Sequence, residues 1–186
     1  MAHPLEIERG DIEGPFMMRP RRFGDDRGYF SETWRQAHFE EALGRKVHFV
    51  QDNESVSGTN VLRGLHFQIP DHAQGKLVRV ARGAALDVAV DLRKGSPTFG
   101  QHQKALLTEE NRWQFWVPEG FAHGFLTLEP DTVFCYKCTE VYSPEHERSL
   151  LWNDADLAID WGTGSPLLSA KDEVAPAFAA FQSPFD

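Results

Sequence analysis

Three short segments of the chain contain more histidine, arginine and tyrosine than the packing of a core requires. Residues 51–68 contain Arg63 and His66 three positions apart, PEGFAHGF contains His123, and TVFCYKCT contains Tyr136. Imidazole and phenol groups transfer protons, and a guanidinium group suits the oxygens of a phosphate. These residue types indicate a polar pocket, in which proton transfer and the binding of an anionic molecule are both open.

Each of these residues also has an ordinary structural role. A histidine in a strand is more often a hydrogen-bonded core or surface group than a catalyst, Arg63 could pair with any of 28 acidic residues, and Tyr136 can pack beside Phe134. Asp172 follows Ser169 at the spacing of a helix cap and can be no more than that cap. Residue types and spacing alone therefore predict a β domain with a pocket and leave its chemistry open.

The segments that must position these residues have the pattern of successive short strands. KLVRVARGAALDVAVDLR contains two apolar runs separated by Gly83, which predicts a hairpin. In the second run one face carries Leu86, Val88, Val90 and Leu92, and the other carries Asp87, Ala89 and Asp91. RWQFWVP, HGFLTL and TVFCYKCT continue the pattern, with turn signals at 118–120 and 129–131. Many short strands at this spacing predict a sandwich or a barrel.

Helices are expected only at the edges of the fold. QAHFEEAL, residues 36–43, is a short amphipathic candidate that ends at Gly44. Ser169 and Asp172 have the spacing of a capping box, with Asp in place of the usual Glu or Gln, and predict a second short helix. The 186 residues contain no internal repeat and no linker-like tract, so one mainly β domain over residues 1–186 is expected.

The net charge of −9 argues against binding to nucleic acid or to an anionic membrane surface. The N-terminal stretch lacks the features of a signal peptide, and no apolar run has the length of a membrane span, so a cytoplasmic protein is expected. The two cysteines, Cys135 and Cys138, lie three positions apart in a predicted strand and project to opposite faces. They are therefore expected to be packing residues rather than a metal or redox pair.

The motifs VLRGLHFQ, GKLVRV, DVAVDLR, SPTFG, PEGFAHGF, YKCT and ERSLLWND together resemble the dTDP-4-dehydrorhamnose 3,5-epimerases in order and spacing, from about Arg19 to about Asp172. The resemblance implies a double-stranded β-helix, the jelly-roll barrel of the cupin superfamily, and a homodimer. It implies a dTDP-linked 4-keto-6-deoxy sugar as substrate, with dTDP-4-dehydro-6-deoxyglucose converted to dTDP-4-dehydrorhamnose. Such epimerases remove a proton beside the keto group and return one to the opposite face, which requires no metal and no other cofactor.

The resemblance also assigns the catalytic roles. His66 of the RGLH motif is the expected base, and Asp172 is the carboxylate that would orient it and stabilise its imidazolium form. Tyr136 is the expected acid on the other face of the sugar. Lys76 of GKLVRV is expected to face the C4 oxygen as this oxygen becomes negative.

A larger set of substrate contacts follows from the same resemblance. Arg63 and His123 are expected near the diphosphate, and Phe30 and Tyr142 are expected to stack against the thymine base. The other substrate-binding positions that it implies are Arg27, Glu32, Gln51, Asn53, Lys76, Glu147 and Lys171. Phe67 occupies a position where tyrosine is common in the family, so the chain is expected to lack a hydroxyl beside the base.

Two other functions compete with the epimerase. PEGFAH resembles the second metal-binding motif of cupins, but His66-Phe-Gln68 replaces the H-x-H of the first motif, and glutamine is a poor substitute for an imidazole ligand. A sugar-nucleotide-binding module without turnover would need neither His66 nor Tyr136. Because both residues are present, the enzyme is favoured.

Overall fold

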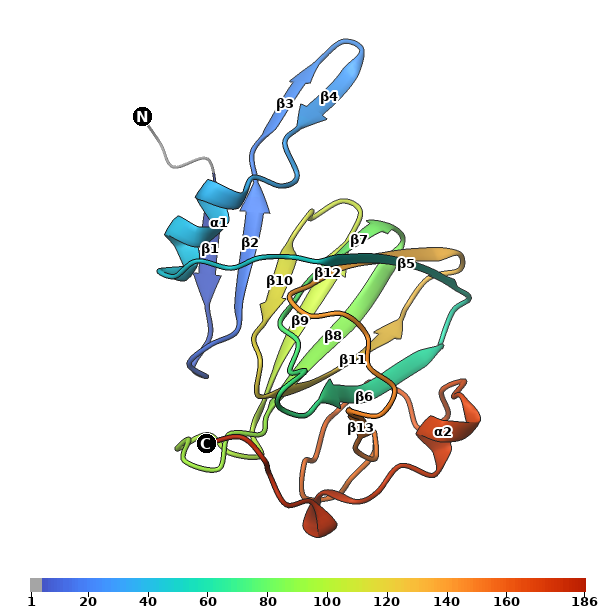
Figure 1. Cartoon of the computed structure of the whole chain (residues 1–186). Coiled ribbons are helices and arrows are strands. Elements are labelled where there is room, and N and C mark those ends of the chain that lie inside the picture. Colours follow the sequence, from blue (N-terminus) through green and yellow to red (C-terminus); the bar gives the residue numbers. More distant parts are fainter. Residues whose placement is uncertain (1–4) are drawn as a thin grey trace.

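Two antiparallel sheets face each other in the computed structural model, which describes residues 5–186 (Figure 1). The strand order is β1-β2-β10-β7-β12-β5 in the six-stranded sheet and β13-β6-β11-β8-β9 in the five-stranded sheet. Neighbouring strands thus come from distant parts of the chain, as in a jelly roll. The prediction of a mainly β, cupin-like jelly-roll barrel with short peripheral helices is confirmed.

The elements have the following bounds. The six-stranded sheet consists of β1 (Leu5–Arg9), β2 (Phe16–Pro20), β10 (Gln114–Val117), β7 (Lys76–Arg82), β12 (Thr132–Cys138) and β5 (Gln51–Ser57). The five-stranded sheet consists of β13 (Glu147–Ser149), β6 (Leu62–Gln68), β11 (Phe121–Thr127), β8 (Ala84–Asp91) and β9 (His102–Thr108). The other elements are the hairpin strands β3 (Arg22–Asp25) and β4 (Gly28–Ser31), the helices α1 (Gln36–Leu43) and α2 (Ala170–Glu173), and the 3-10 helix η1 (Phe178–Ala180). The predicted strands and helices are all present, with shifts of one or two residues at some ends.

The space between the sheets is filled in part by apolar side chains that alternate along their strands. Phe134 of the six-stranded sheet packs against Ala89 and Phe125 of the five-stranded sheet. The rings of Phe125 and Phe134 are stacked, with their centroids 3.8 Å apart. Burial of one such side chain contributes about 1.5–3 kcal/mol to stability, so this contact fixes the spacing of the two sheets.

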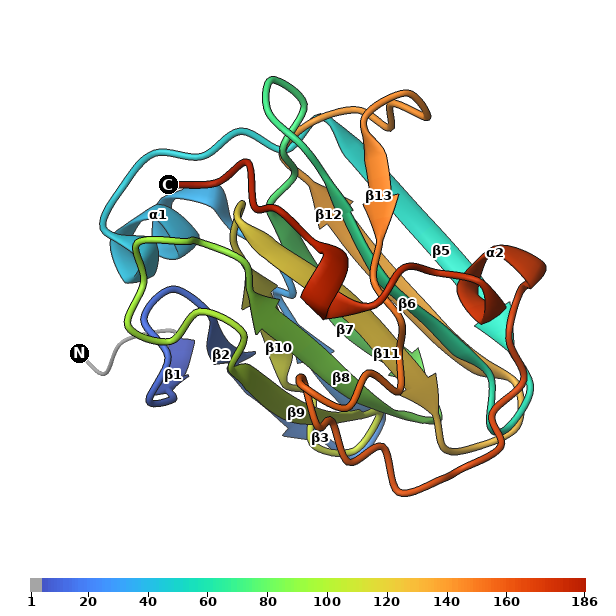
Figure 2. The ribbon, with the colours of Figure 1, turned by 90° about the horizontal axis from the view of Figure 1, so that it is seen from below.

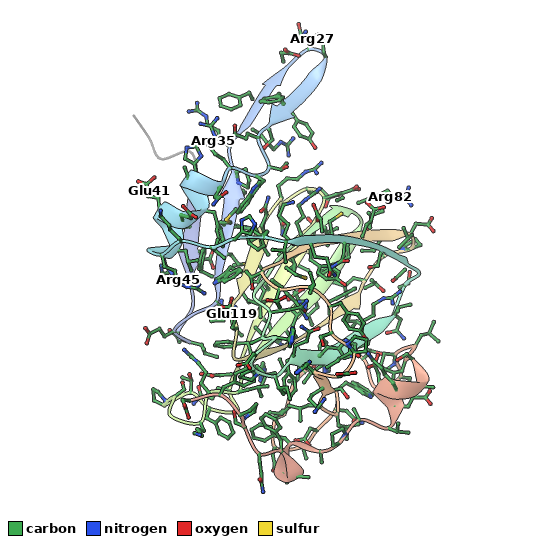
Figure 3. All side chains as sticks on the ribbon, viewed as in Figure 1. Arg27, Arg35, Glu41, Arg45, Arg82 and Glu119 are labelled. Carbon is green, nitrogen blue, oxygen red and sulfur yellow. The ribbon has the colours of Figure 1, made fainter. Side chains whose placement is uncertain are left out.

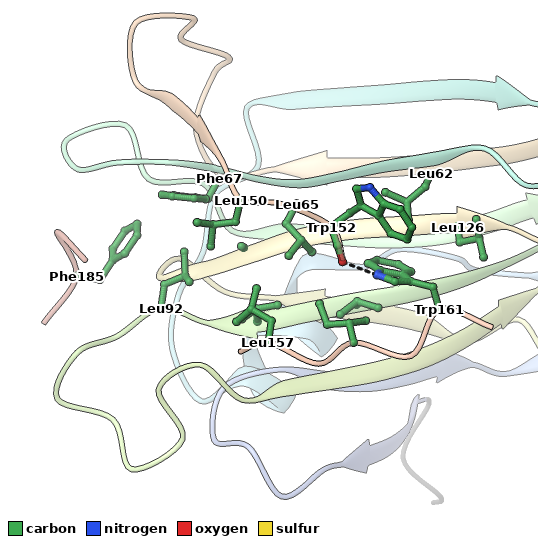
Figure 4. Packing of buried hydrophobic residues seen from close by; sticks show 14 residues of the cluster. Leu62, Leu65, Phe67, Leu92, Leu126, Leu150, Trp152, Leu157, Trp161 and Phe185 are labelled. Atoms are coloured by element: carbon green, nitrogen blue, oxygen red, sulfur yellow. Dashed lines mark hydrogen bonds between the residues drawn. The ribbon is translucent and has the colours of Figure 1, made fainter. Parts of the chain in front are cut away.

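The outer face of each sheet is covered as well. Phe39 of α1 packs against Phe16 and Trp116 on the six-stranded sheet. The C-terminal segment crosses the five-stranded sheet (Figure 2) and adds Trp152 and Trp161 to its outer core. The indole nitrogen of Trp161 donates a hydrogen bond to the carbonyl of Trp152 at 2.8 Å (Figure 4). Strands β8 and β11 are therefore buried on both faces.

The ends of both helices follow the predicted signals. Helix α1 ends at Gly44, whose φ of 78° is left-handed and whose N–H donates to the carbonyl of Glu40. Helix α2 begins after Ser169, whose hydroxyl accepts a hydrogen bond from the N–H of Asp172 at 3.3 Å. No helix in the described part of the chain is long and apolar enough to cross a membrane.

The hairpin β3–β4 projects away from both sheets (Figure 1), and Arg27 lies at its tip (Figure 3). Its side chains Phe23, Tyr29 and Phe30 are 53%, 46% and 68% exposed. Large aromatic side chains that stay exposed together are characteristic of surfaces that contact another molecule.

Candidate active site

A cavity of about 420 Å³ opens between the two sheets. Six predicted site residues line it: Arg63, His66, Lys76, His123, Tyr136 and Asp172. Strands β6 and β11 of the five-stranded sheet supply the arginine and the two histidines, whereas β7 and β12 of the six-stranded sheet supply the lysine and the tyrosine. The predicted base and the predicted acid therefore stand on opposite walls of one cavity.

The close approach of β6 to β11 sets the two histidines side by side. Gly64 has a φ of 134°, and a Cβ atom at this position would lie 2.5 Å from the Cα of Gly124. Only glycine fits such a contact at such a φ. His66 pairs directly with His123 in this register, which then shifts before Phe125. Gly64 thus allows β6 and β11 to present both imidazoles on one wall.

His66 and Asp172 form a hydrogen-bonded pair. The distance from Nε2 of His66 to Oδ1 of Asp172 is 2.6 Å, and the aspartate side chain is only 3% exposed. Burial raises the pKa of Asp172, but the hydrogen bond and charge of His66, together with Ser169 and Lys171, hold this pKa below its usual value. An ionised Asp172 fixes the proton of His66 on Nε2, so the lone pair of the ring is on Nδ1.

Lys76 and Tyr136 stand on the opposite wall, where both residues are partly buried. Burial lowers the pKa of Lys76, and electrostatic interactions with Cys138, Glu147 and Asp87 act to raise it. Burial also raises the pKa of Tyr136, so its hydroxyl keeps its proton at neutral pH. The wall therefore presents a proton-bearing phenol beside a buried amine.

A second polar cluster stands next to the histidine wall. Lys171 Nζ donates to Glu147 Oε1 at 2.8 Å, and the hydroxyl of Tyr142 donates to Glu147 Oε2 at 3.0 Å. Burial raises the pKa of Glu147, but these two hydrogen bonds and the charges of Lys171 and His66 hold it below the usual value. Because α2 carries both Lys171 and Asp172, the cluster also ties this helix to β13.

Gln51 and Asn53 lie on β5, directly beside the tyrosine strand. Asn53 pairs in register with Tyr136, and the amide of Gln51 donates to Asn53 Oδ1 at 3.0 Å. Gln51 Oε1 accepts a hydrogen bond from the N–H of Tyr142 at 2.9 Å. These two residues thus connect the strand of Tyr136 to the loop that contains Tyr142, but they are not among the cavity-lining residues.

The structure does not bring Arg27, Phe30 and Glu32 to the cavity of their own chain. Arg27 pairs with Asp25 at the tip of the hairpin, 2.5 Å apart. Phe30 and Glu32 instead line a separate hollow of about 320 Å³ at the base of the hairpin. These three predicted contacts belong to a different surface of the molecule.

Phe67 and Gln68 follow His66 in the RGLHFQ motif, and neither lines the cavity. The expectation of a missing hydroxyl beside the base is wrong, because Phe67 faces the outer core and its ring contacts Phe181 and Phe185. The amide of Gln68 donates to the carbonyl of His72 at 2.6 Å. Among the described residues there is no group of three or more His, Cys, Asp or Glu side chains suited to a metal ion.

The two cysteines are unpaired and differ in burial, as their spacing predicts. Cys138 is 1% exposed and opposes Lys76 in the β7–β12 register, and Cys135 is partly exposed. Asp87 was not among the predicted site residues, although it is fully buried and hydrogen-bonded to His123. The one signal for it in the sequence is an acidic residue in the middle of a strand whose neighbouring residues are apolar.

Comparison with known proteins gives consistent matches. The family model described as dTDP-4-dehydrorhamnose 3,5-epimerase matches residues 9–180. A Salmonella typhimurium protein of that name is 57% identical over 166 residues, which cover 89% of this chain and 91% of the relative. A Pseudomonas aeruginosa protein of that name is 56% identical over 176 residues, covering 94% and 97%.

A solved structure of the dTDP-6-deoxy-D-glucose-3,5-epimerase of Legionella pneumophila, in complex with dTDP-4-keto-L-rhamnose, superposes with a TM-score of 0.92. The two chains are 46% identical, and the match covers 96% of this chain and 95% of the other.

Proposed function

The chain belongs to the dTDP-4-dehydrorhamnose 3,5-epimerase family and is an isomerase, and from this premise we propose that it converts dTDP-4-dehydro-6-deoxyglucose to dTDP-4-dehydrorhamnose by inverting C3 and C5. One observation supports the proposal most directly. The hydrogen-bonded His66 and Asp172 stand on one wall of the cavity, and Tyr136 and Lys76 stand on the other. A reaction that takes a proton from one face of a carbon and adds one to the other face needs such an arrangement.

The proposed mechanism begins at the acidic hydrogens beside the C4 keto group. Nδ1 of His66 takes the proton from carbon, and the ionised Asp172 stabilises the imidazolium that forms. The electron pair of the broken C–H bond moves to O4, where Lys76 donates a hydrogen bond to the enolate oxygen. The electron pair returns from O4 to the carbon as Tyr136 delivers a proton to its opposite face, and exchange with solvent then takes the proton from His66 and reprotonates Tyr136. Loss of one such oxyanion donor lowers kcat by about 10²–10³-fold in other enzymes.

The nucleotide contacts are proposed from charge and exposure. Arg63 has no carboxylate partner among the described residues: its Nη2 donates to the hydroxyl of Ser57 at 3.1 Å. Its charge is therefore available to the diphosphate, with His123 lining the same cavity. Tyr142 is 52% exposed and free to stack on the thymine base. Gln51, Asn53, Glu147 and Lys171 surround these groups as further contacts.

A proton-exchange assay tests the proposed function. In deuterated water, NMR should show deuterium at C3 and C5 of dTDP-4-keto-6-deoxyglucose and conversion to the inverted sugar. A sugar-nucleotide-binding module would bind dTDP and leave both positions protonated. Binding without exchange by the folded wild-type protein would therefore overturn the proposal.

We further propose a homodimer in which the hairpin β3–β4 of one chain reaches the other copy. The exposed aromatic residues of the hairpin and the distance of Arg27 and Phe30 from their own cavity both support this arrangement. Exchange of an element between identical chains is a common route to such dimers.

Mixing two inactive variants should restore activity if the hairpin acts on the other copy. Arg27→Ala combined with Phe30→Ala disables the hairpin, and His66→Ala disables the cavity. After subunit exchange, half of the dimers are mixed and each has one intact site, so activity should recover to about a quarter of wild type. Analytical ultracentrifugation checks the assembly. A dimer whose mixture stays inactive, or a monomeric protein, contradicts the proposal.

Activity should survive exhaustive chelation and need no added nicotinamide. This expectation rests on the placement of Gln68, which stands where the first cupin motif has its second histidine. Its amide donates to the carbonyls of His72 and Val141, so it does not act with His66 as a metal ligand. The measurement is the initial rate after dialysis against EDTA. A rate that disappears with EDTA and returns with one divalent metal would favour the metal-dependent cupin instead.

A further inference from the structure

Asp87 is a buried carboxylate that the proposed mechanism does not use. It lies in the middle of β8, opposite Phe125 in register, and its side chain is 0% exposed. It shares its face of β8 with Ala85 and Ala89, both of which belong to the apolar core between the sheets. A buried charge in such surroundings costs several kcal/mol unless it is paired, so its partners indicate what it does.

Both oxygens of Asp87 contact one histidine of the cavity wall. Nε2 of His123 lies 2.9 Å from Oδ1 and 3.1 Å from Oδ2. His123 is only 7% exposed, yet it lines the cavity. A carboxylate on Nε2 fixes a proton on that nitrogen and so fixes the orientation of the ring.

Asp87 also interacts with Lys76 on the facing sheet. The charges that act on the pKa of Lys76 come from Cys138 on β12, Glu147 on β13, Asp87 on β8 and Lys171 on α2. The other titratable groups of the cavity that Lys76 lines are Arg63, His66, His123, Tyr136 and Asp172. Burial raises the pKa of the Cys138 thiol, so this group is neutral at pH 7. Glu147 is already paired with Lys171 at 2.8 Å. Among the groups that act on the pKa of Lys76, Asp87 is the carboxylate that has no lysine or arginine ion pair of its own.

We propose that Asp87 is a positioning residue of the epimerase, which holds the ring of His123 through its Nε2–H and serves as the buried counter-charge of Lys76. The inference rests on the proposed function, because Lys76 and His123 are assigned there to the enolate and the diphosphate. Asp87 lies behind the cavity-lining residues and acts on the substrate only through these two side chains.

Burial raises the pKa of Asp87, whereas the charge and hydrogen bond of His123 and the charge of Lys76 favour its ionised form. In that form Asp87 has a defined effect on pH dependence. Burial lowers the pKa of Lys76, and the negative charge of Asp87 raises it back toward the usual value. Asp87→Asn removes that charge, so the pKa of Lys76 falls further and the amine loses its proton at lower pH. Activity that depends on the protonated amine should therefore decline at lower pH in the variant than in the wild type.

Asp91 provides a matched control on the same strand. It lies two alternations further along the same face of β8 and is also 0% exposed. Its partners belong to the loop after β8: Arg93 at 2.7 Å, Ser96 at 2.6 Å and Thr98 at 2.7 Å. Asp91→Asn thus replaces an equally buried carboxylate and leaves His123 and Lys76 untouched.

The experiment compares wild type, Asp87→Asn and Asp91→Asn in kcat and KM across pH, and records ¹⁵N spectra of the histidines. Asp87→Asn should lower kcat on the order of a hundredfold, the usual effect of a misplaced catalytic group, and shift the alkaline limb to lower pH. Asp91→Asn should keep the wild-type profile. Equal profiles for the two folded variants would overturn the inference.

The ¹⁵N spectra keep the test decisive if Asp87→Asn does not fold. In the wild-type protein, His123 should carry its proton on Nε2 throughout the neutral range, and a proton on Nδ1 alone would overturn the inference. This measurement needs no turnover. Failure of the proposed function would appear separately, as a wild-type protein that exchanges no deuterium.

Discussion

His66→Ala should abolish deuterium exchange at both C3 and C5 of dTDP-4-keto-6-deoxyglucose. The cavity presents one imidazole that is oriented by an ionised carboxylate at 2.6 Å, and this pair is the proposed base for both carbons. The second imidazole, His123, is held by Asp87 and is assigned to the diphosphate. Loss of a general base lowers the rate by about 10²–10⁴-fold, and no other group on that wall replaces it.

The prediction needs a variant that folds and binds. His66 is partly exposed at the cavity surface, with 23% of its side chain accessible, so its truncation should leave the core and the affinity for dTDP nearly unchanged. Circular dichroism and a dTDP titration establish both points. His48→Ala is the matched control, because His48 is exposed and is not a cavity-lining residue. Exchange at near-wild-type rates in folded His66→Ala would refute the assignment of the base.

Much of the fold follows from alternation along the strands. The split of β8 into a Leu86–Leu92 face and an Asp87–Asp91 face, the helix that ends at Gly44 and the cap at Ser169 were all predictable, because each depends on local geometry. The short strands β1, β3, β4 and β13 carry too few residues for a periodic signal. They form because a neighbouring strand completes their hydrogen bonds. The pattern of residues within the short strand does not predict which strand will pair with it.

Six of the residues that line the cavity were predictable from the sequence, but their arrangement was not. His66 and Asp172 are 106 positions apart, and only the folded C-terminal segment brings them into contact. The sequence does not predict Asp87 as a site residue, because an acidic residue in an alternating strand usually faces water, whereas β8 is buried on both faces. Phe67 is expected beside His66 because it follows His66 in the sequence. In a strand, however, consecutive side chains point to opposite faces, so Phe67 lies in the outer core.

Tyr136→Phe should separate proton removal from inversion. His66 takes a proton and can return it to the same face, which exchanges hydrogen for deuterium without changing the configuration of the carbon. Inversion requires a proton from the opposite wall, where Tyr136 is the proposed donor and where burial keeps its hydroxyl protonated. We therefore expect residual deuterium exchange at C3 and no doubly inverted product. Loss of a general acid typically lowers the rate of its step by about 10²–10⁴-fold.

Phenylalanine makes this test specific to the hydroxyl. The ring of Tyr136 lies 6.3 Å from that of Phe134, and phenylalanine keeps this packing, so no cavity is created in the wall. NMR of the sugar product in deuterated water distinguishes exchange from inversion at each carbon. If Tyr136 were only a packing residue, the folded Tyr136→Phe variant would give the doubly inverted sugar at a near-normal rate, and the acid would have to be sought elsewhere on the same wall.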